Sequence, residues 1–243
     1  AQLDRLLAES ARVGTAHAAD GERRSAAARL LAAARAESFE LQLQLKRLQE
    51  EVERIRLRRI GELFERFPRA VRDLARSLSK RVSVEIEGGE VAVDKQVLDQ
   101  LDKVLLHLVR NSVDHGLEAP AERLAAGKPE EGRLWLAARP VGGLVEVTVR
   151  DDGRGIDPRR LRESAVRRGA LSEQQAAALT DEEATELIFR SGFSTRDEVT
   201  DLSGRGVGLD VVQRQVEQLG GSVSCEAAPG KGARFVLRVP ISV

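Results

Sequence analysis

One polar-striped segment and two glycine-rich segments, in a fixed order, restrict the fold of this chain more than any other feature. The three segments are HLVRNSVDH at 107–115, DDGRG at 151–155 and GRGVG at 204–208. In a helix, residues four apart share a face, so His107, Asn111 and either Asp114 or His115 would form one polar stripe on the apolar run VLLHLV. Such a stripe needs a buried or bound partner, which predicts a site beside this helix.

The glycine-rich segments are typical of backbone that lies close to a ligand. The first ends the alternating run LVEVTVR, a predicted strand, and puts Asp151 at its tip, where a carboxylate can accept a hydrogen bond from an exocyclic amine. The second precedes the helical segment VGLDVVQRQVEQL, and its bare N–H groups can cradle phosphate. The glycines concerned are Gly153, Gly155, Gly204, Gly206 and Gly208. Together the three segments predict one nucleotide pocket.

These motifs and three longer strings resemble a known family. The strings are RIGELFERFPRAVRDLAR at 59–76, HLVRNSVDHGLE at 107–118 and GFSTRDEVTDLSGRGVGLDVV at 192–212. From roughly residue 48 to 243, the chain resembles the ATPase domain of GHKL-superfamily histidine kinases, and most closely the chemotaxis kinase (CheA) family. The resemblance implies an α+β fold: a dimerisation-like helical hairpin over 1–58, then an ATP-binding catalytic domain over 59–243. The latter would be a Bergerat-type sandwich, whose mixed, mainly antiparallel sheet is covered by helices and an ATP lid.

The resemblance also implies a role for each polar residue. Asn111 would bind Mg²⁺, an ion that takes few protein ligands when phosphates supply the rest. Asp151 would accept from the N6 amine of adenine, and Gly153 and Gly155 would let the base approach. His107, where many relatives carry a glutamate, would orient or deprotonate the attacking imidazole. A second histidine, His115, would contact phosphate or Mg²⁺-bound water. Packing or turn-forming roles remain open for each.

The N-terminal part is expected to be helical. Leu41, Leu45, Leu48, Val52 and Ile55 form an a/d seam over two heptads, which suits a helix that packs on a partner or on its own domain. An earlier apolar pattern and a glycine-containing turn predict a shorter helix before it. In the resembling family, a hairpin at this place dimerises. Because the first helix is short, a weak homodimer is expected here.

The rest of the chain alternates between strand and helix patterns. We expect a helix over 62–79 interrupted near Pro68, and paired strands VSVEIEG and EVAV joined at Gly88 and Gly89. Asp94 is the expected N-cap of a long helix that stops at Gly116. Further expected elements are the strands RLWLAARPV and LVEVTVR, a polar lid over 156–203, and a closing hairpin of SVSCEAA and ARFVLRVPI.

The resemblance predicts the catalytic core of a protein histidine kinase that uses ATP and Mg²⁺. It would phosphorylate a histidine on a separate phosphotransfer domain in chemotaxis-type two-component signalling. The only histidine of the hairpin, His17, lies in a loop-like context. A receptor and a coupling protein would act through neighbouring domains. The alternatives are a GHKL ATPase clamp and a non-catalytic nucleotide-binding adaptor.

Composition excludes several other classes. Lys plus Arg equals Asp plus Glu at 39 each, so the overall charge favours neither nucleic acid nor an anionic membrane. The single cysteine rules out an internal disulfide and a cysteine-cluster metal site. No apolar run is long enough to span a membrane, so direct membrane insertion is not expected. The chain begins with Ala and has no Met, and we expect a fragment of a longer cytoplasmic protein.

Overall fold

The computed structural model describes residue 35 and residues 37–46, 56–190 and 208–242. The chain divides into two units, Ala1–Ile55 and Arg56–Val243. In the first unit, residues 37–46 are helical, and Leu41 and Leu45 are 61% and 59% exposed. The remaining seam positions and His17 lie outside the described residues. The hairpin and the domain boundaries therefore stay predictions.

The second unit is built on a five-stranded sheet with the strand order β2-β4-β5-β7-β6. Strands β2 and β4 are parallel, whereas β4–β5, β5–β7 and β7–β6 are antiparallel. A small antiparallel pair, β1 with β3, lies apart from this sheet. The strands are β1 Leu57–Arg59, β2 Val82–Glu87, β3 Ala92–Asp94, β4 Gly132–Val141, β5 Leu144–Asp151, β6 Ser222–Ala228 and β7 Gly232–Pro240. The expected mixed, mainly antiparallel sheet is confirmed.

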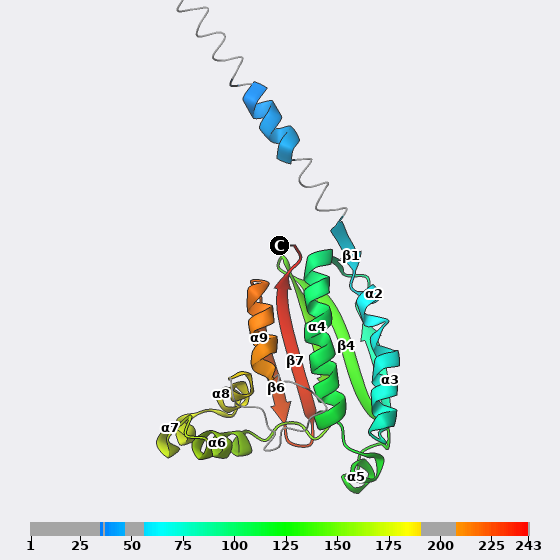
Figure 1. Ribbon diagram of the computed structural model, residues 1–243, viewed down its shortest axis with the longest axis vertical. Coiled ribbons are helices and arrows are strands. Elements are labelled where there is room, and N and C mark those ends of the chain that lie inside the picture. The colour runs from blue at the N-terminus through cyan, green and yellow to red at the C-terminus, as the bar shows by residue number, and fades with distance from the viewer. Residues whose placement is uncertain (1–34, 36, 47–55, 191–207, 243) are drawn as a thin grey trace, which may run out of the picture. The chain divides into compact units, whose positions relative to one another are not determined.

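Helices cover the sheet. Figure 1 shows α4 between α3 and α9; α3 packs on β2, α4 on β5 and β7, and α9 on β6. The helices are α2 Gly61–Phe64, α3 Phe67–Ser77, α4 Lys95–Asn111, α5 Pro120–Ala125, α6 Pro158–Arg167, α7 Glu173–Ala178, α8 Asp181–Glu186 and α9 Leu209–Gln218. A π-helical turn, η1 Ser112–Gly116, extends α4, and a 3-10 turn, η2 Leu187–Phe189, follows α8.

The long helix α4 is the centre of the core, and its sequence explains why. The Asp94 carboxylate accepts from the backbone N–H of Gln96 at 2.7 Å, which confirms the expected N-cap. Leu101, Leu105 and Leu108 recur at helical spacing and are fully buried. Because this apolar face is held against the sheet, the polar end of α4 has a fixed place.

One expected strand pairing is wrong. Strand β2 pairs in parallel with β4, and β3 pairs with β1, so the two neighbouring segments form no hairpin. Gly88 has a φ of +70°, and the Gly89 carbonyl accepts from the N–H of Gly61 at 2.9 Å. These contacts turn the chain toward residue 60 instead of back along β2. Alternation of apolar residues identifies a strand but carries no information about its partner.

The other helices and strands expected between residues 56 and 151 and after residue 208 are confirmed with small shifts, whereas the lid stays a prediction. The helix break falls between Phe64 and Phe67, one residue before Pro68, and β6 and β7 form the closing hairpin. Over 156–190 the polar segment contains α6, α7 and α8, and residues 191–207 lie outside the described residues. Ala165 and Leu187 form a small core of this segment. Among the described helices, none is long and apolar enough to cross a membrane.

Candidate functional site

Asp151 ends β5 and carries a buried carboxyl. Its side chain is 2% exposed, and Oδ1 accepts from the backbone N–H of Gly153 at 3.0 Å and of Ala233 at 3.3 Å. Burial raises the pKa of this carboxyl, while the two N–H groups and the neighbouring Ser112 hydroxyl oppose the rise. Oδ2 faces Gly116, where an added Cβ would lie 3.1 Å from it. The site therefore presents one acceptor oxygen beside a residue without a side chain.

The glycines of the loop 151–155 bring three backbone segments together. A Cβ on Gly153 would lie 2.1 Å from the Gly116 carbonyl oxygen, a distance too short for any side-chain carbon. Gly155 has a φ of +68°, and a Cβ there would lie 2.0 Å from the Ala228 carbonyl oxygen. Only glycine therefore lets this loop pack between η1 and the β6–β7 connection. Their contact with a base stays a prediction.

His107 lies on α4 with an unsatisfied nitrogen. Its Nε2 is buried and has no hydrogen-bond partner among the described residues. Burial lowers the pKa of the imidazole, the nearby Arg110 cation lowers it further, and the Asp210 carboxylate on α9 opposes both. The imidazole is therefore neutral at neutral pH. A neutral, unpaired ring nitrogen can accept a proton or hydrogen-bond a ligand.

Asn111 is the last residue of α4, and a wider turn follows it. The N–H of Leu117 donates to the Ser112 carbonyl at 2.7 Å, an i→i+5 bond that closes the π-turn η1. The Ser112 side chain that follows is buried, and its hydroxyl lies beside the Asp151 carboxyl. The four-residue spacing of the polar stripe therefore holds from His107 to Asn111 and changes beyond it.

His115 lies in the π-turn η1 and is partly exposed. Its side chain is 47% exposed, and its Nε2 lies 3.3 Å from Asp114 Oδ2. Lys80, which no sequence pattern singles out, donates to the carbonyls of Val113 and Asp114 at 2.8 and 2.6 Å. Lys80 thus caps the π-turn. A lysine far away in sequence gives no pattern that would reveal this contact.

The second glycine-rich segment is described only at its end. Gly204 and Gly206 lie outside the described residues, whereas Gly208 is the N-cap of α9. A Cβ on Gly208 would lie 2.8 Å from Asp210 Oδ1. Helices α4 and α9 are packed together, so the amino end of α9 belongs to the neighbourhood of His107. Free N–H groups at a helix start suit phosphate oxygens.

The candidate residues offer polar groups of the kinds that a nucleotide uses. Asp151 supplies a buried acceptor, and His107 Nε2 is a buried polar atom without a partner among the described residues. Unpaired buried polar atoms are costly and rare in folded proteins, so a ligand or water is expected at His107. Ser112 was missed because it follows Asn111 directly and only the π-turn brings it beside Asp151. Within the described residues, no group of three or more His, Cys, Asp or Glu side chains could hold a metal ion.

Comparison with known proteins identifies the family of this chain. The family model for histidine kinase-, DNA gyrase B- and HSP90-like ATPases matches residues 96–243. The gliding motility regulatory protein of Myxococcus xanthus is 48% identical over 199 residues, which cover 82% of this chain and 26% of that protein. The chemotaxis protein CheA of Bacillus subtilis is 44% identical over 196 residues, 81% of this chain and 29% of that protein.

Among solved structures, the catalytic domain of the histidine kinase ThkA is similar at a TM-score of 0.49, with 18% identity. That similarity covers 76% of this chain and 95% of the other.

The chain spans only 26% of the Myxococcus xanthus protein and 29% of the Bacillus subtilis protein described above.

Proposed function

The chain belongs to the family of histidine kinase-, DNA gyrase B- and HSP90-like ATPases, and we propose that it is the catalytic core of a chemotaxis-type protein histidine kinase. It transfers the γ-phosphoryl group of ATP to a histidine on a separate phosphotransfer domain. The observation that carries this proposal is the buried Asp151 carboxyl together with His107 Nε2 on α4, a buried nitrogen without a hydrogen-bond partner among the described residues. The similarity to proteins named CheA supports a kinase over the other activities of the family.

Asp151 selects adenine in this proposal. The N6 amine of adenine donates to its carboxylate, whereas guanine presents a carbonyl oxygen at the same place. Because the carboxyl is buried, a wrong base would leave it without a donor, which costs more than at an exposed site. The neighbouring Gly116 leaves room beside Oδ2, since an added Cβ would crowd that oxygen at 3.1 Å.

Asn111 would hold Mg²⁺ through its amide oxygen, and the ATP phosphates would supply other ligands. That ion would neutralise the charge that develops on the phosphate oxygens. Gly208 starts α9, whose free N–H groups lie in the neighbourhood of His107 and suit the phosphate end of the nucleotide. The remaining candidates, Gly204, Gly206 and His115, would contact the phosphates or the water around the ion.

His107 acts on the incoming substrate histidine. In the transfer, an imidazole nitrogen of the substrate bonds to the γ-phosphorus, the bond from that phosphorus to the ADP oxygen breaks, and the substrate imidazole loses a proton. A neutral His107 can accept that proton or orient the attacking ring. The lowered pKa of His107 keeps the ring neutral at neutral pH, as this role requires.

The partners follow from the same proposal. A receptor and a coupling protein would act through domains beyond this segment, and a response regulator would receive the phosphoryl group. The first unit would support a weak homodimer, and the protein would work in the cytoplasm.

The decisive experiment is a transfer assay. The chain is incubated with γ-labelled ATP, Mg²⁺ and a candidate phosphotransfer domain, and acid-labile, base-stable label is expected on the added domain. The same domain with its acceptor histidine changed to Gln should stay unlabelled. Steady hydrolysis of ATP without labelling of any phosphotransfer domain would instead indicate an ATPase clamp. Failure to turn ATP over at all would indicate an adaptor.

A further inference from the structure

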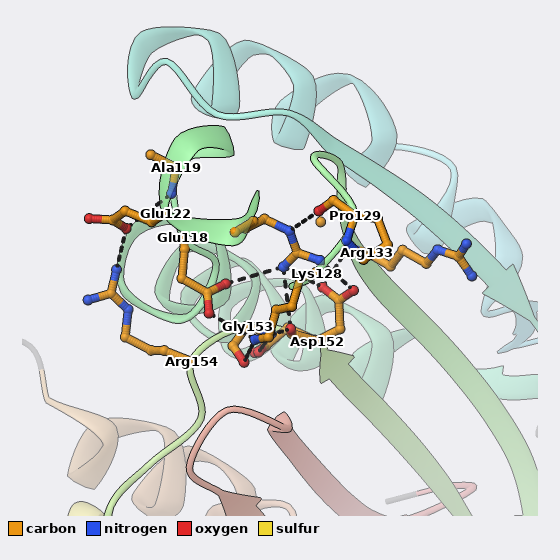
Figure 2. Close-up of polar contacts among 12 residues, drawn as sticks. Glu118, Ala119, Glu122, Lys128, Pro129, Arg133, Asp152, Gly153 and Arg154 are labelled. Carbon is orange, nitrogen blue, oxygen red and sulfur yellow. Dashed lines mark hydrogen bonds and ion pairs between the residues drawn. The ribbon is translucent and has the colours of Figure 1, made fainter. Parts of the chain in front are cut away.

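A cluster of charged side chains, of which Glu118 and Arg123 are buried and Lys128 and Asp152 half-buried, lies behind the loop that carries Asp151. The loop clamp, as we call it, consists of Glu118, Arg123, Lys128 and Asp152. Arg123 is 0% exposed and forms a two-pronged ion pair with Asp152, at 3.1 Å to Oδ1 and 2.9 Å to Oδ2. Glu118 accepts from Arg123 at 3.2 Å and from Lys128 at 2.8 Å. Figure 2 shows Lys128 between the Glu118 side chain and the main chain of Asp152 and Gly153.

The cations of the loop clamp also hold the main chain of the loop. Lys128 Nζ donates to the carbonyl of Asp152 at 3.0 Å and to that of Gly153 at 2.6 Å. Arg123 reaches the same Asp152 carbonyl at 3.3 Å. Each of these bonds has a charged donor, which makes it stronger than a bond between neutral groups. The direction of the Asp152 carbonyl is therefore set from behind the loop.

That carbonyl is connected rigidly to the Asp151 side chain. The Asp152 C=O and the Gly153 N–H belong to one planar peptide group and point in opposite directions. The Gly153 N–H donates to Asp151 Oδ1 at 3.0 Å. One end of the peptide thus carries the bonds from Lys128 and Arg123, and the other end holds the carboxylate. A rotation of this peptide would move the carboxylate that faces the base.

A stabilising role explains the loop clamp less well. Removing ions from water is costly, and buried ion pairs are often no more stabilising than apolar residues of the same volume. The two cations and two carboxylates of the loop clamp balance in charge, so no charge in the cluster is left uncompensated. Such a balanced cluster is not expected to make folding much more favourable than apolar residues would. A positioning role, by contrast, accounts for two cations that both donate to the Asp152 carbonyl.

We infer that Lys128 and Arg123 are positioning residues that orient the Asp151 carboxylate through the Asp152–Gly153 peptide and so set the preference of the site for adenine over guanine. The inference rests on the proposed nucleotide function and adds the part of the molecule that determines base selectivity. Neither cation needs to touch the nucleotide.

The test compares the affinities of the chain for Mg·ATP and Mg·GTP by calorimetry. Lys128→Met removes both carbonyl bonds, and ATP should bind about tenfold more weakly while GTP changes little, so the ratio of the two affinities falls. Lys128→Met combined with Glu118→Gln removes one charge of each sign and should lose the same selectivity. The matched control is Arg81→Met, which breaks only an exposed ion pair with Glu130 at 2.8 Å and should change neither affinity.

The outcomes separate the inference from the proposed function. A parent chain that binds neither nucleotide, or binds both equally, would contradict the proposed adenine site itself. A parent that prefers ATP, with the preference unchanged in Lys128→Met, would overturn the inference alone. Recovery of selectivity in the charge-balanced double variant would mean that an unpaired charge causes the loss seen in Lys128→Met. That outcome would also overturn the inference. Loss of folding in both variants would make the loop clamp a purely structural element, and the inference would then be wrong as well.

Discussion

Asp151 combines two opposed properties. Its carboxyl is buried, which raises its pKa, yet its Oδ1 accepts two backbone N–H bonds that favour the ionised form. Burial of such a group costs free energy unless a partner compensates for it. Perturbed carboxyls of this kind are concentrated at functional sites. The amine of a bound adenine would supply the missing donor.

Asp151→Asn tests this residue directly. The amide cannot offer the same acceptor charge, so the variant should lose a charge-assisted bond of about 1.5–3 kcal/mol, or roughly ten- to hundredfold in ATP affinity. Calorimetry with Mg²⁺ present measures the change, and circular dichroism checks that the fold is intact. ATP affinity equal to that of the parent would disprove the assignment.

His107→Gln should separate binding from transfer. Glutamine keeps a polar side chain on α4 but cannot take up a proton, so ATP affinity should change little while phosphoryl transfer falls by about 10²-fold or more. Single-turnover transfer to a cognate phosphotransfer domain measures the rate. Transfer at the parent rate would mean that His107 serves only the packing of α4.

The same variant has a second readout in the pH dependence of stability. Above the ordinary histidine pKa of about 6.5, the ring is neutral in both states. Below it, the unfolded chain binds a proton that folded His107 resists, because burial lowers its pKa, so the free energy of unfolding should fall toward acid pH. Urea unfolding between pH 7.5 and 5 should show a shallower slope for His107→Gln than for the parent.

The sequence singles out candidate site residues more readily than the contacts that hold them. Spacing points to His107, Asn111 and Asp151 as candidates, because helical periodicity and a strand end are local properties. Ser112 and Lys80 escaped notice because a π-turn and a lysine from another element place them there. Contacts between residues far apart in sequence leave no periodic signal.

At the scale of elements, local patterns predicted the strands and helices but not all of their partners. The N-cap at Asp94, the break before Pro68 and the β6–β7 hairpin all depend on neighbouring residues. The partner of β2 is β4, whose first residue Gly132 pairs with Val82. Fifty positions separate these two residues, whereas β3 follows β2 directly in the sequence. The sequence therefore favoured β3 as the partner of β2.

Asp94→Ala should weaken the element on which the core depends. The change removes the bond to the Gln96 N–H at 2.7 Å and the ion pair with Arg56 at 3.1 Å. Loss of an N-cap costs about 1–2 kcal/mol, and α4 packs on the sheet along its length, so the whole unit should lose this stability. Urea unfolding measures it. Asp99→Ala, on the exposed face of the same helix, is the matched control and should leave stability unchanged or slightly higher.

At the scale of the whole molecule, the two units differ in whether the chain itself covers their apolar faces. Residues 56–190 and 208–242 form a core with a continuous apolar face on α4, so the chain itself completes their burial. The described helix of the first unit exposes Leu41 and Leu45 at 61% and 59%. Periodicity identifies such a face but cannot say what covers it, because the partner of a seam is not part of the pattern.

A second copy of the chain is the expected cover for this seam. We predict a weak, concentration-dependent dimer that Leu45→Glu combined with Leu48→Glu dissociates, because two carboxylates in an apolar interface have no partner to offset their desolvation. Nucleotide binding should survive, since Asp151 and His107 lie in the other unit. Light scattering across a concentration series measures the association, and calorimetry with ATP measures the binding. A parent that stays monomeric at high micromolar concentration, with a double variant that unfolds, would show that the seam packs within its own chain.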